Sequence, residues 1–353
     1  MRPNPRSFAC NASIFRHYKN GEKIGHIIQK IGQRDEYIKQ NLLYLYKLHS
    51  LSGDNIPVIT FSHHKGGTGK TTSCLNIAGF LVKAGKKVLV VDCDPQANAT
   101  VGLGYSSQAA GKNMYDVFLS GIEDFPEIKI SEIIKKTPSG IDLASSGLDL
   151  VGADPVLYRV EGRAEILKRS LLEIRDQYDF ILIDTPPSLG QLVINGLYAS
   201  DRIIVTLDSG TFALEGVSTL STIFSDMKEN LGREVRPDFA ILTRWGEGGY
   251  PDGERKEPEE KKDLLFIIRN LFVRKAEPTP EEIRAAEEQK TEQERLLAIL
   301  SEVKRLFPAV YTIPYSPLVY EAQKRGVPIS HFSADSGVGR AYQSIAEEVL
   351  KWK

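Results

Sequence analysis

The sequence predicts an α/β fold: a doubly wound, mostly parallel sheet flanked by helices. Two observations lead to this prediction. Short apolar runs rich in β-branched residues alternate with segments whose apolar residues recur at helical spacing, and this alternation is typical of a parallel sheet covered on both faces. The first of these runs, IPVITFSHH, also leads through a glycine-rich stretch directly into a helical pattern. We therefore expect a strand–loop–helix–strand unit to open the sheet.

The opening unit is expected over residues 56–94. Its first strand is expected in the run of residues 56–64, and the segment TTSCLNIAGFLVKAG repeats apolar residues at helical spacing as far as Gly85. A glycine at that position is a helix stop signal. The run KKVLVVDCD follows at once and is predicted as the second strand.

Four later apolar runs are expected to extend the sheet. They share the short pattern of buried strands, and they read YDFILIDTPPS, DRIIVTLDS, DFAILTRW and AVYTIPYS. Helical patterns separate them, notably at residues 167–175 and 214–231. No internal repeat is present, so the pattern indicates one sheet rather than a repeat array.

Two segments are expected outside the sheet. Residues 1–56 form a basic N-terminal helical extension, with nine Lys and Arg against four Asp and Glu, and residues 57–353 form the main domain. Residues 247–295 are expected as a charged helical insertion within that domain. A capping box at residues 279–282, with proline at the first helical position, predicts a helix that ends at Phe307. We expect the extension and the insertion to form an auxiliary helical layer.

Composition excludes several classes of protein. The chain has 353 residues, of which 41% are hydrophobic and 26% charged, and its net charge is -1. Any surface for nucleic acid must therefore be a local patch. The three cysteines form no CxxC pair, and no apolar run reaches the length of a membrane span. The N-terminus has no apolar block like that of a signal peptide. A soluble cytoplasmic protein is the expectation.

The glycine-rich stretch after the first strand predicts a phosphate-binding loop. Its glycines allow backbone N–H groups to face phosphates, and the following helix adds its positive N-terminal end. Lys70 is expected to reach the β- and γ-phosphates of ATP, and the Thr71 hydroxyl is expected to ligate Mg²⁺. The expected nucleotide-binding residues are Lys65, Gly66, Gly67, Thr68, Gly69, Lys70, Thr71, Thr72 and Pro314.

Two aspartates at expected strand ends complete the predicted site. Asp184 ends the strand FILID, where a carboxylate can hold a magnesium-bound water. Asp94 ends the strand that we expect beside the phosphate loop, and a carboxylate there is suited to orienting the attacking water. The predicted metal site therefore comprises Thr71 and Asp184, and Asp94 is a predicted catalytic residue.

These motifs resemble those of the ParA/MinD ATPases. KGGTGKT matches the deviant Walker A form KGGxGK[ST], DCDPQANAT resembles the second ParA motif, and YDFILIDTPPSLG resembles the Walker B strand. MYDVFLSG and FALEGVSTL are similar to further ParA blocks. The resemblance covers roughly residues 57–245 and 300–350, in family order, and is strongest to partition ATPases of the Soj/ParA type.

The resemblance implies a P-loop ATPase that dimerises with ATP. In the family the first lysine crosses the dimer interface to the phosphates of the other subunit, which makes Lys65 a catalytic residue together with Lys70 and Asp94. The resemblance further implies non-specific DNA binding by the ATP dimer and stimulation of hydrolysis by a ParB-like or adaptor protein. The expected function is plasmid or chromosome partition in the cytoplasm, in association with the nucleoid.

The expected DNA-binding residues depart from the family pattern. Arginines commonly follow the C-terminal Ile-Pro pair in the family, whereas Tyr315 and Leu318 occur here. Non-specific DNA binding depends mainly on phosphate neutralisation, so a displaced basic patch can serve. The candidate residues for that patch are Lys324, Arg325, Arg340 and Lys351.

Two other functions were compared with DNA partition. The alternative is an ATPase that positions a non-DNA cargo. That cargo would be a protein complex, or the protein would act at a membrane in the manner of MinD. The last segment, GRAYQSIAEEVLKWK, lacks an amphipathic tail beyond its helix, so no membrane partner is expected. An electron carrier like the nitrogenase iron protein would need a pair of exposed cysteine ligands. Cys74 and Cys93 are expected inside a helix and a strand, so no iron cluster is expected.

Overall fold

The computed structural model describes residues 56–63, 65–108, 111–122, 124–188, 190–209, 222, 224–225, 227–245, 294 and 296–352. Residues Ile56–Trp352 belong to one compact unit. The predicted N-terminal extension, except for Ile56, and nearly all of the predicted insertion, including its capping box, lie outside the described residues.

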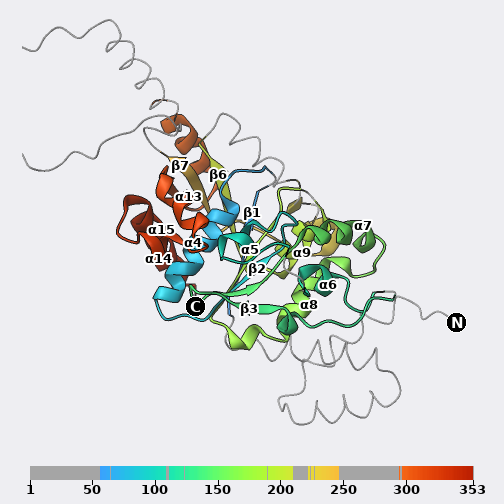
Figure 1. The fold of residues 1–353 in the computed structure, drawn as a ribbon. Helices are drawn as coiled ribbons and strands as arrows, with labels where there is room; N and C mark the ends of the chain where they lie inside the picture. The colour runs from blue at the N-terminus through green and yellow to red at the C-terminus, as the bar shows by residue number, and fades with distance from the viewer. Residues whose placement is uncertain are drawn as a thin grey trace, which may run out of the picture. The chain divides into compact units, whose positions relative to one another are not determined.

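The described chain is built on one eight-stranded sheet with the order β3-β4-β2-β5-β1-β6-β7-β8 (Figure 1). The strands are β1 Val58–Ser62, β2 Val88–Asp92, β3 Ile134–Lys136, β4 Asp142–Ala144, β5 Phe180–Asp184, β6 Arg202–Asp208, β7 Phe239–Trp245 and β8 Val310–Pro314. All neighbouring strands run parallel except the edge pair β3 and β4, which is antiparallel. The predicted fold class, a doubly wound and mostly parallel sheet, is therefore confirmed.

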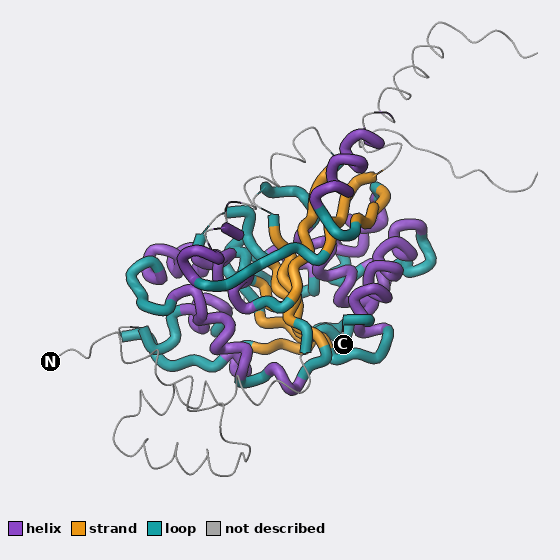
Figure 2. Tube along the Cα trace, turned by 180° about the vertical axis from the view of Figure 1, so that it is seen from behind, coloured by secondary structure: helices purple, strands orange, loops and turns teal. Residues whose placement is uncertain are grey.

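Helices cover both faces of this sheet (Figure 2). The α-helices are α4 Lys70–Lys83, α5 Asn98–Gly102, α6 Met114–Phe118, α7 Ala153–Leu157, α8 Ile166–Leu172, α9 Gln191–Ala199, α13 Pro317–Lys324, α14 Ile329–Phe332 and α15 Gly337–Leu350. Short 3₁₀ turns add η2 Ile130–Glu132, η3 Leu148–Gly152, η4 Arg163–Glu165 and η5 Arg175–Gln177. Residues 227–231 and 296–306 are also helical. No helix of the described part is both long and apolar enough to cross a membrane.

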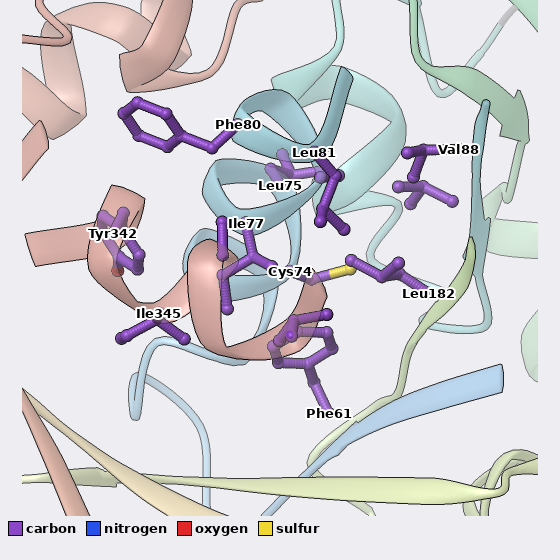
Figure 3. Packing of buried hydrophobic residues seen from close by; sticks show 14 of the residues in the cluster. Phe61, Cys74, Leu75, Ile77, Phe80, Leu81, Val88, Leu182, Tyr342 and Ile345 are labelled. Carbon is purple, nitrogen blue, oxygen red and sulfur yellow. The ribbon is translucent and has the colours of Figure 1, made fainter. Parts of the chain in front are cut away.

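The helix α4 forms the centre of one apolar layer. Its Cys74 lies beside Leu182 of β5 on one side, and its Ile77 lies on the side where Tyr342 and Ile345 of α15 approach (Figure 3). All five side chains are almost completely buried. Burial of a large apolar side chain contributes roughly 1.5–3 kcal/mol, so this packing holds the first helix rigidly on the sheet.

Two further apolar clusters complete the core. Side chains of α6, α7 and α8 cover β2, β4 and β5 on the opposite face. Side chains of α9 and of the helical residues 296–306 cover β6 and β7. Phe307, at which the sequence predicted the end of the long helix, lies directly after those helical residues and belongs to this third cluster.

One predicted strand end is wrong. The strand that contains the DCD sequence was predicted to end at Asp94, but β2 ends at Asp92. The neighbours of β1 are β5 and β6, so β5 separates β1 from β2. Chain order indicates which strands exist, whereas strand order depends on crossover connections that the local pattern does not contain.

Candidate functional site

The loop between β1 and α4 lies at the carboxyl edge of the parallel sheet. Gly67 and Gly69 have φ angles of 78° and 83°, in the left-handed region that favours glycine. A Cβ on Gly69 would also lie 2.7 Å from Cγ2 of Thr243. Glycine at position 69 is therefore required twice, by its backbone conformation and by the close approach of β7.

Lys70 is the first residue of α4, and its side chain is buried at the base of the loop. The residue is 6% exposed, and its Nζ donates a hydrogen bond of 3.0 Å to the carbonyl of Lys65. Burial lowers the pKa of Lys70, while the nearby carboxylates of Asp184 and Asp94 oppose that change. The ammonium group is thus held by the loop backbone close to two acidic side chains.

Thr71 and Asp184 form a hydroxyl–carboxylate pair. Thr71 Oγ1 donates to Asp184 Oδ2 at 2.7 Å, and Asp184 is fully buried at the end of β5. Its other oxygen, Oδ1, has no hydrogen-bond partner in the described part of the chain. Burial and the neighbouring Asp92 raise the pKa of Asp184. A buried carboxylate oxygen without a partner, next to a hydroxyl oxygen, is a donor set that suits a hard divalent cation.

Asp94 lies in the loop after β2 and not in the strand itself. It is 5% exposed and accepts a hydrogen bond of 2.9 Å from the backbone N–H of Gln96. Burial raises the pKa of Asp94, against the effects of the Gln96 hydrogen bond and of Lys70. The sequence analysis wrongly expected Asp94 at the end of the strand. Asp94 nevertheless lines the same cavity as Lys70.

A closed ring of hydrogen bonds holds the loop that carries Asp94. Asp92 Oδ1 accepts from Asp94 N at 3.1 Å, and its Oδ2 accepts from Thr100 Oγ1 at 2.7 Å. Thr100 Oγ1 accepts from Ser146 N at 3.0 Å, and Ser146 Oγ donates to Asp94 O at 2.8 Å. Sequence reasoning missed Asp92, although an acidic residue at the end of an apolar strand was a visible signal.

Lys65 occupies the mouth of the loop. Its side chain is 40% exposed, and its Nζ lies 3.7 Å from Oδ2 of Asp208 at the end of β6. The backbone N–H of Lys65 donates to His63 Nδ1 at 3.1 Å. Asp208 was also missed by sequence reasoning, which recognised its strand but could not place β6 next to β1.

An open cavity of about 680 Å³ extends from the loop to the segment between β8 and α13. Seven of the nine predicted nucleotide-binding residues line it, and the two exceptions are Lys65 and Thr68. Thr68 is buried instead, with its hydroxyl 3.1 Å from that of Thr206 on β6. Gln323 of α13 lines the cavity as well and donates to Thr72 Oγ1 at 3.1 Å. Pro314 lies at the end of the cavity formed by β8 and α13.

The structure does not gather the four predicted DNA-binding residues into one patch. Lys324 and Arg325 are exposed at the end of α13, over the rings of Tyr320 and Phe332. Arg340, on α15, donates to the carbonyl of Asp335. Lys351 pairs with Glu348 at 2.6 Å.

The environment of Lys351 differs from that of the other three residues. Its neighbour Trp352 packs on Phe239, the first residue of β7, with ring centroids 5.3 Å apart. Trp352 also lies under the guanidinium of Arg202, the first residue of β6. Lys351 is therefore at the amino edge of the sheet, opposite the loop.

The two described cysteines offer no cluster site. Cys74 and Cys93 are free thiols, each with 0% exposure, and they belong to different apolar clusters. Burial raises the pKa of both thiols. Within the described residues no group of three or more His, Cys, Asp or Glu side chains could hold a metal ion by themselves.

Comparison with known proteins places this loop and sheet in a family. Residues 56–237 match the family described as "AAA domain". The chain is 31% identical to the chromosome-partitioning ATPase Soj of Treponema pallidum over 293 residues, which are 83% of this chain and 96% of Soj. It is 36% identical to the sporulation initiation inhibitor protein Soj of Bacillus subtilis over 296 residues, 83% of this chain and 97% of that protein.

A solved structure shows the same fold. The structure titled cobyrinic acid a,c-diamide synthase from Mycobacterium smegmatis, with bound ADP and magnesium, matches with a TM-score of 0.61 and 25% identity. The match covers 84% of this chain and 94% of that one. Together the sheet and the loop define a P-loop fold of the nucleoside-triphosphatase class. Within it, the chain belongs to the ParA/MinD family of P-loop ATPases.

Proposed function

We propose that this protein is an ATP-dependent, dimerising partition ATPase. The observation that carries the proposal is the division of work between two lysines of one loop. Lys70 is buried in the cavity, whereas Lys65 stands outside it with 40% of its side chain exposed. This exposed position at the mouth of the loop supports a role in which Lys65 contacts the phosphates of another subunit.

ATP and Mg²⁺ are the proposed cofactors. The Mycobacterium smegmatis structure holds ADP and magnesium, and the pair formed by Thr71 and the unpartnered oxygen of Asp184 fits a divalent cation here. The backbone N–H groups from Gly66 to Thr72 and the Lys70 ammonium would hold the phosphates. The cation, when bound, would neutralise the charge that develops on the transferred phosphoryl group.

Asp94 is the proposed water-positioning residue for hydrolysis. It lines the cavity with Lys70, and the hydrogen-bond ring through Asp92 and Ser146 holds its backbone. Burial raises the pKa of Asp94, and the Gln96 hydrogen bond and the nearby Lys70 oppose that change. In its ionised form the Asp94 carboxylate would accept a hydrogen bond from the attacking water. Hydrolysis by such a site serves as a timer for the ATP-bound dimer.

Dimerisation is proposed to depend on a change of partner for Lys65. In the single chain its ammonium lies near Asp208. Two facing nucleotides would bring together about eight negative charges, counting roughly four for each ATP, and cations from the opposite subunit would offset them. ATP would thus draw Lys65 across the interface.

The proposed cargo is a DNA molecule, and the proposed stimulating partner is a ParB-like or adaptor protein. The relative from Treponema pallidum is named a chromosome-partitioning ATPase. Lys324, Arg325 and Arg340 are the proposed contacts of the dimer with DNA phosphates. Lys351 lies at the other edge of the sheet and is not included among them. Association with the nucleoid would follow from this DNA binding.

Co-sedimentation with DNA of mixed sequence tests the proposal. The protein is mixed with DNA in the presence of ATP, of ADP or of no nucleotide, at several salt concentrations. ATP-dependent and salt-sensitive sedimentation is expected, and Lys70→Ala should abolish it. Sedimentation that is independent of nucleotide, or binding to liposomes in its place, would contradict the proposed role in DNA partition.

A further inference from the structure

Arg244, near the carboxyl end of β7, has an unusual backbone conformation. Its φ is 57°, and Ala97 is the other non-glycine residue with a positive φ in the described part of the chain. The pairing of β7 with β8 shifts between Leu242 and Trp245, which marks a β-bulge. The Ser209 hydroxyl donates to the Arg244 carbonyl at 3.0 Å and helps to hold this conformation. Strain of this kind persists where the surrounding structure enforces it, and it concentrates at functional sites.

The bulge directs Arg244 to the candidate site. Bulges next to active sites commonly re-aim a side chain, and Arg244 lines the cavity together with its neighbour Thr243. Thr243 touches the loop, because its hydroxyl donates to the Thr68 carbonyl at 3.2 Å and its methyl group lies close to Gly69. On the other side Tyr315 N donates to the Trp245 carbonyl at 3.3 Å. Arg244 therefore lies between the loop and the β8–α13 segment.

The charge of the cavity makes this position significant. Among the described residues that line it, Lys70 and Arg244 are the two cations and Asp94 is the one anion. The carboxyl groups of Asp92 and Asp184 lie fully buried close by, and burial raises the pKa of Asp184. The guanidinium of Arg244 forms no hydrogen bond or ion pair within the described residues, and its side chain is exposed. A polyphosphate that enters this cavity would meet a permanently charged and available donor.

We propose that Arg244 binds the phosphate chain of the nucleotide within its own subunit, at the end nearer the sugar. This inference rests on the proposed function, since it requires a bound nucleotide. Trp245, the residue after Arg244, pairs with Pro314 and accepts from Tyr315 N, so Arg244 lies on the side of the cavity formed by Pro314 and Tyr315. The proposed magnesium ligands Thr71 and Asp184 and the proposed water-positioning residue Asp94 would mark the γ-phosphate end of the nucleotide. The phosphate that it contacts is therefore one that ADP and ATP share. Arginine is suited to this contact because its planar guanidinium pairs with phosphate oxygens in a bidentate manner.

Direct titration of the full-length protein with a fluorescent mant-ADP, competed by ATP, ADP or adenosine, tests the proposal. Three variants separate charge from backbone: Arg244→Gln removes the charge, Arg244→Lys keeps it, and Arg244→Gly accepts the left-handed conformation without strain. Arg244→Gln and Arg244→Gly should weaken ADP and ATP binding by the same factor, about tenfold or more. Arg244→Lys should retain most of the affinity, and competition by adenosine should not change.

A matched control and three contrary results complete the test. Arg236→Gln removes an exposed arginine that precedes β7 at the amino edge and pairs with Glu234, and it should bind as wild type does. Wild-type nucleotide affinity in Arg244→Gln would overturn the proposal. Weak binding by Arg244→Gln together with normal binding by Arg244→Gly would also overturn it, because the loss of affinity would then come from backbone strain and not from the missing guanidinium. Equal weakening of adenosine would also overturn it. If the wild type bound no nucleotide, or Lys70→Ala bound normally, the proposed function itself would fail.

Discussion

Lys65 and Lys70 are five residues apart, at the two ends of one loop, yet their side chains lie in different surroundings. Lys70 is held at the base of the loop by the carbonyl of Lys65 and is surrounded by carboxylates. Lys65 extends toward Asp208 at the loop mouth with much of its side chain in solvent. A change in one lysine should therefore alter a step that a change in the other does not.

We expect Lys65→Gln to bind ATP and ADP nearly as tightly as the wild type but to lose ATP-induced dimerisation and stimulated hydrolysis. The reason is that Lys65 lies outside the cavity that Lys70 helps to line. Light scattering with ATP measures the dimer, and nucleotide titration measures binding. Lys112→Gln is the control, since Lys112 is similarly exposed and also ion-paired. Normal dimerisation by Lys65→Gln would remove the cross-subunit role.

Asp94→Ala is expected to form an ATP-bound dimer that scarcely turns over. The substitution removes a carboxylate that faces the cavity, while the loop, Thr71 and Asp184 keep their contacts. Phosphate release measures turnover, and a drop of at least about a hundredfold is expected from the loss of such a group. Asp94→Asn, which can still accept from Gln96 N, should behave in the same way. Turnover near the wild-type rate in both variants would show that Asp94 does not position the water.

At the scale of elements, α4 must be held in place for the loop to keep its shape. Asn76 supplies part of this support from a nearly fully buried position. Its Nδ2 donates to the Thr72 carbonyl at 2.8 Å, and its Oδ1 accepts from the backbone N–H of Ile329 on α14 at 2.6 Å. Apolar packing from α15 adds to these two bonds.

We expect Asn76→Ala to lower the free energy of unfolding by about 1–3 kcal/mol, because it leaves the buried N–H of Ile329 without a partner. Urea titration followed by circular dichroism measures this change. Gln343→Ala removes an exposed amide on α15 that bonds only to Glu347 among the described residues, and its effect should be within about 0.5 kcal/mol of zero. If the two variants were equally stable, the contact between α4 and α14 would contribute little.

Elements also show where prediction from the sequence succeeds. The six long apolar runs correspond to β1, β2, β5, β6, β7 and β8, and the first helix was expected within one or two residues of α4. The strands β3 and β4 were missed because three residues are too few to show a period. Asp142 even begins β4 with a buried carboxylate, which its pairing with Lys136 at 2.6 Å makes tolerable.

At the scale of the whole molecule, the compact unit begins at Ile56, two residues before β1. The Nε of Arg175 donates to the Ile56 carbonyl at 3.1 Å, and Asp201 Oδ2 accepts from the Val58 N–H at 3.1 Å. Arg175 and Asp201 are themselves paired. These contacts fix the entry of the first strand from within the compact unit Ile56–Trp352.

Deletion of residues 1–54 is therefore expected to leave a folded protein that binds nucleotide, because every contact just described is retained. Deletion of residues 1–58 removes both backbone partners, and this shorter chain should unfold at a markedly lower temperature. Calorimetry and mant-ADP titration measure the two outcomes. A non-cooperative transition in the longer of these two variants would show that the N-terminal segment is needed for folding, contrary to the proposed domain boundary.

The site divides between what local pattern reveals and what folding brings together. The loop from Lys65 to Thr72, Asp94 and Asp184 were all identified along the chain, because each lies within a few residues of a strand end or a helix start. Glycine content, the start of a helix and an acidic residue at a strand end are local properties of the chain. A short sequence motif is therefore enough to predict them.

Asp208, Thr243, Arg244 and Gln323 are different. They come from β6, β7 and α13, which are brought near the loop by the strand order β1-β6-β7-β8 and by the position of α13 at the carboxyl edge of the sheet. That order arises from long-range pairing and packing energies, which no window of the sequence displays. The bulge that turns Arg244 toward the cavity likewise depends on how β7 meets β8. The phosphate loop can thus be predicted from a short stretch of the sequence. The residues that surround the loop are brought there by the packing of distant segments, which only the tertiary structure shows.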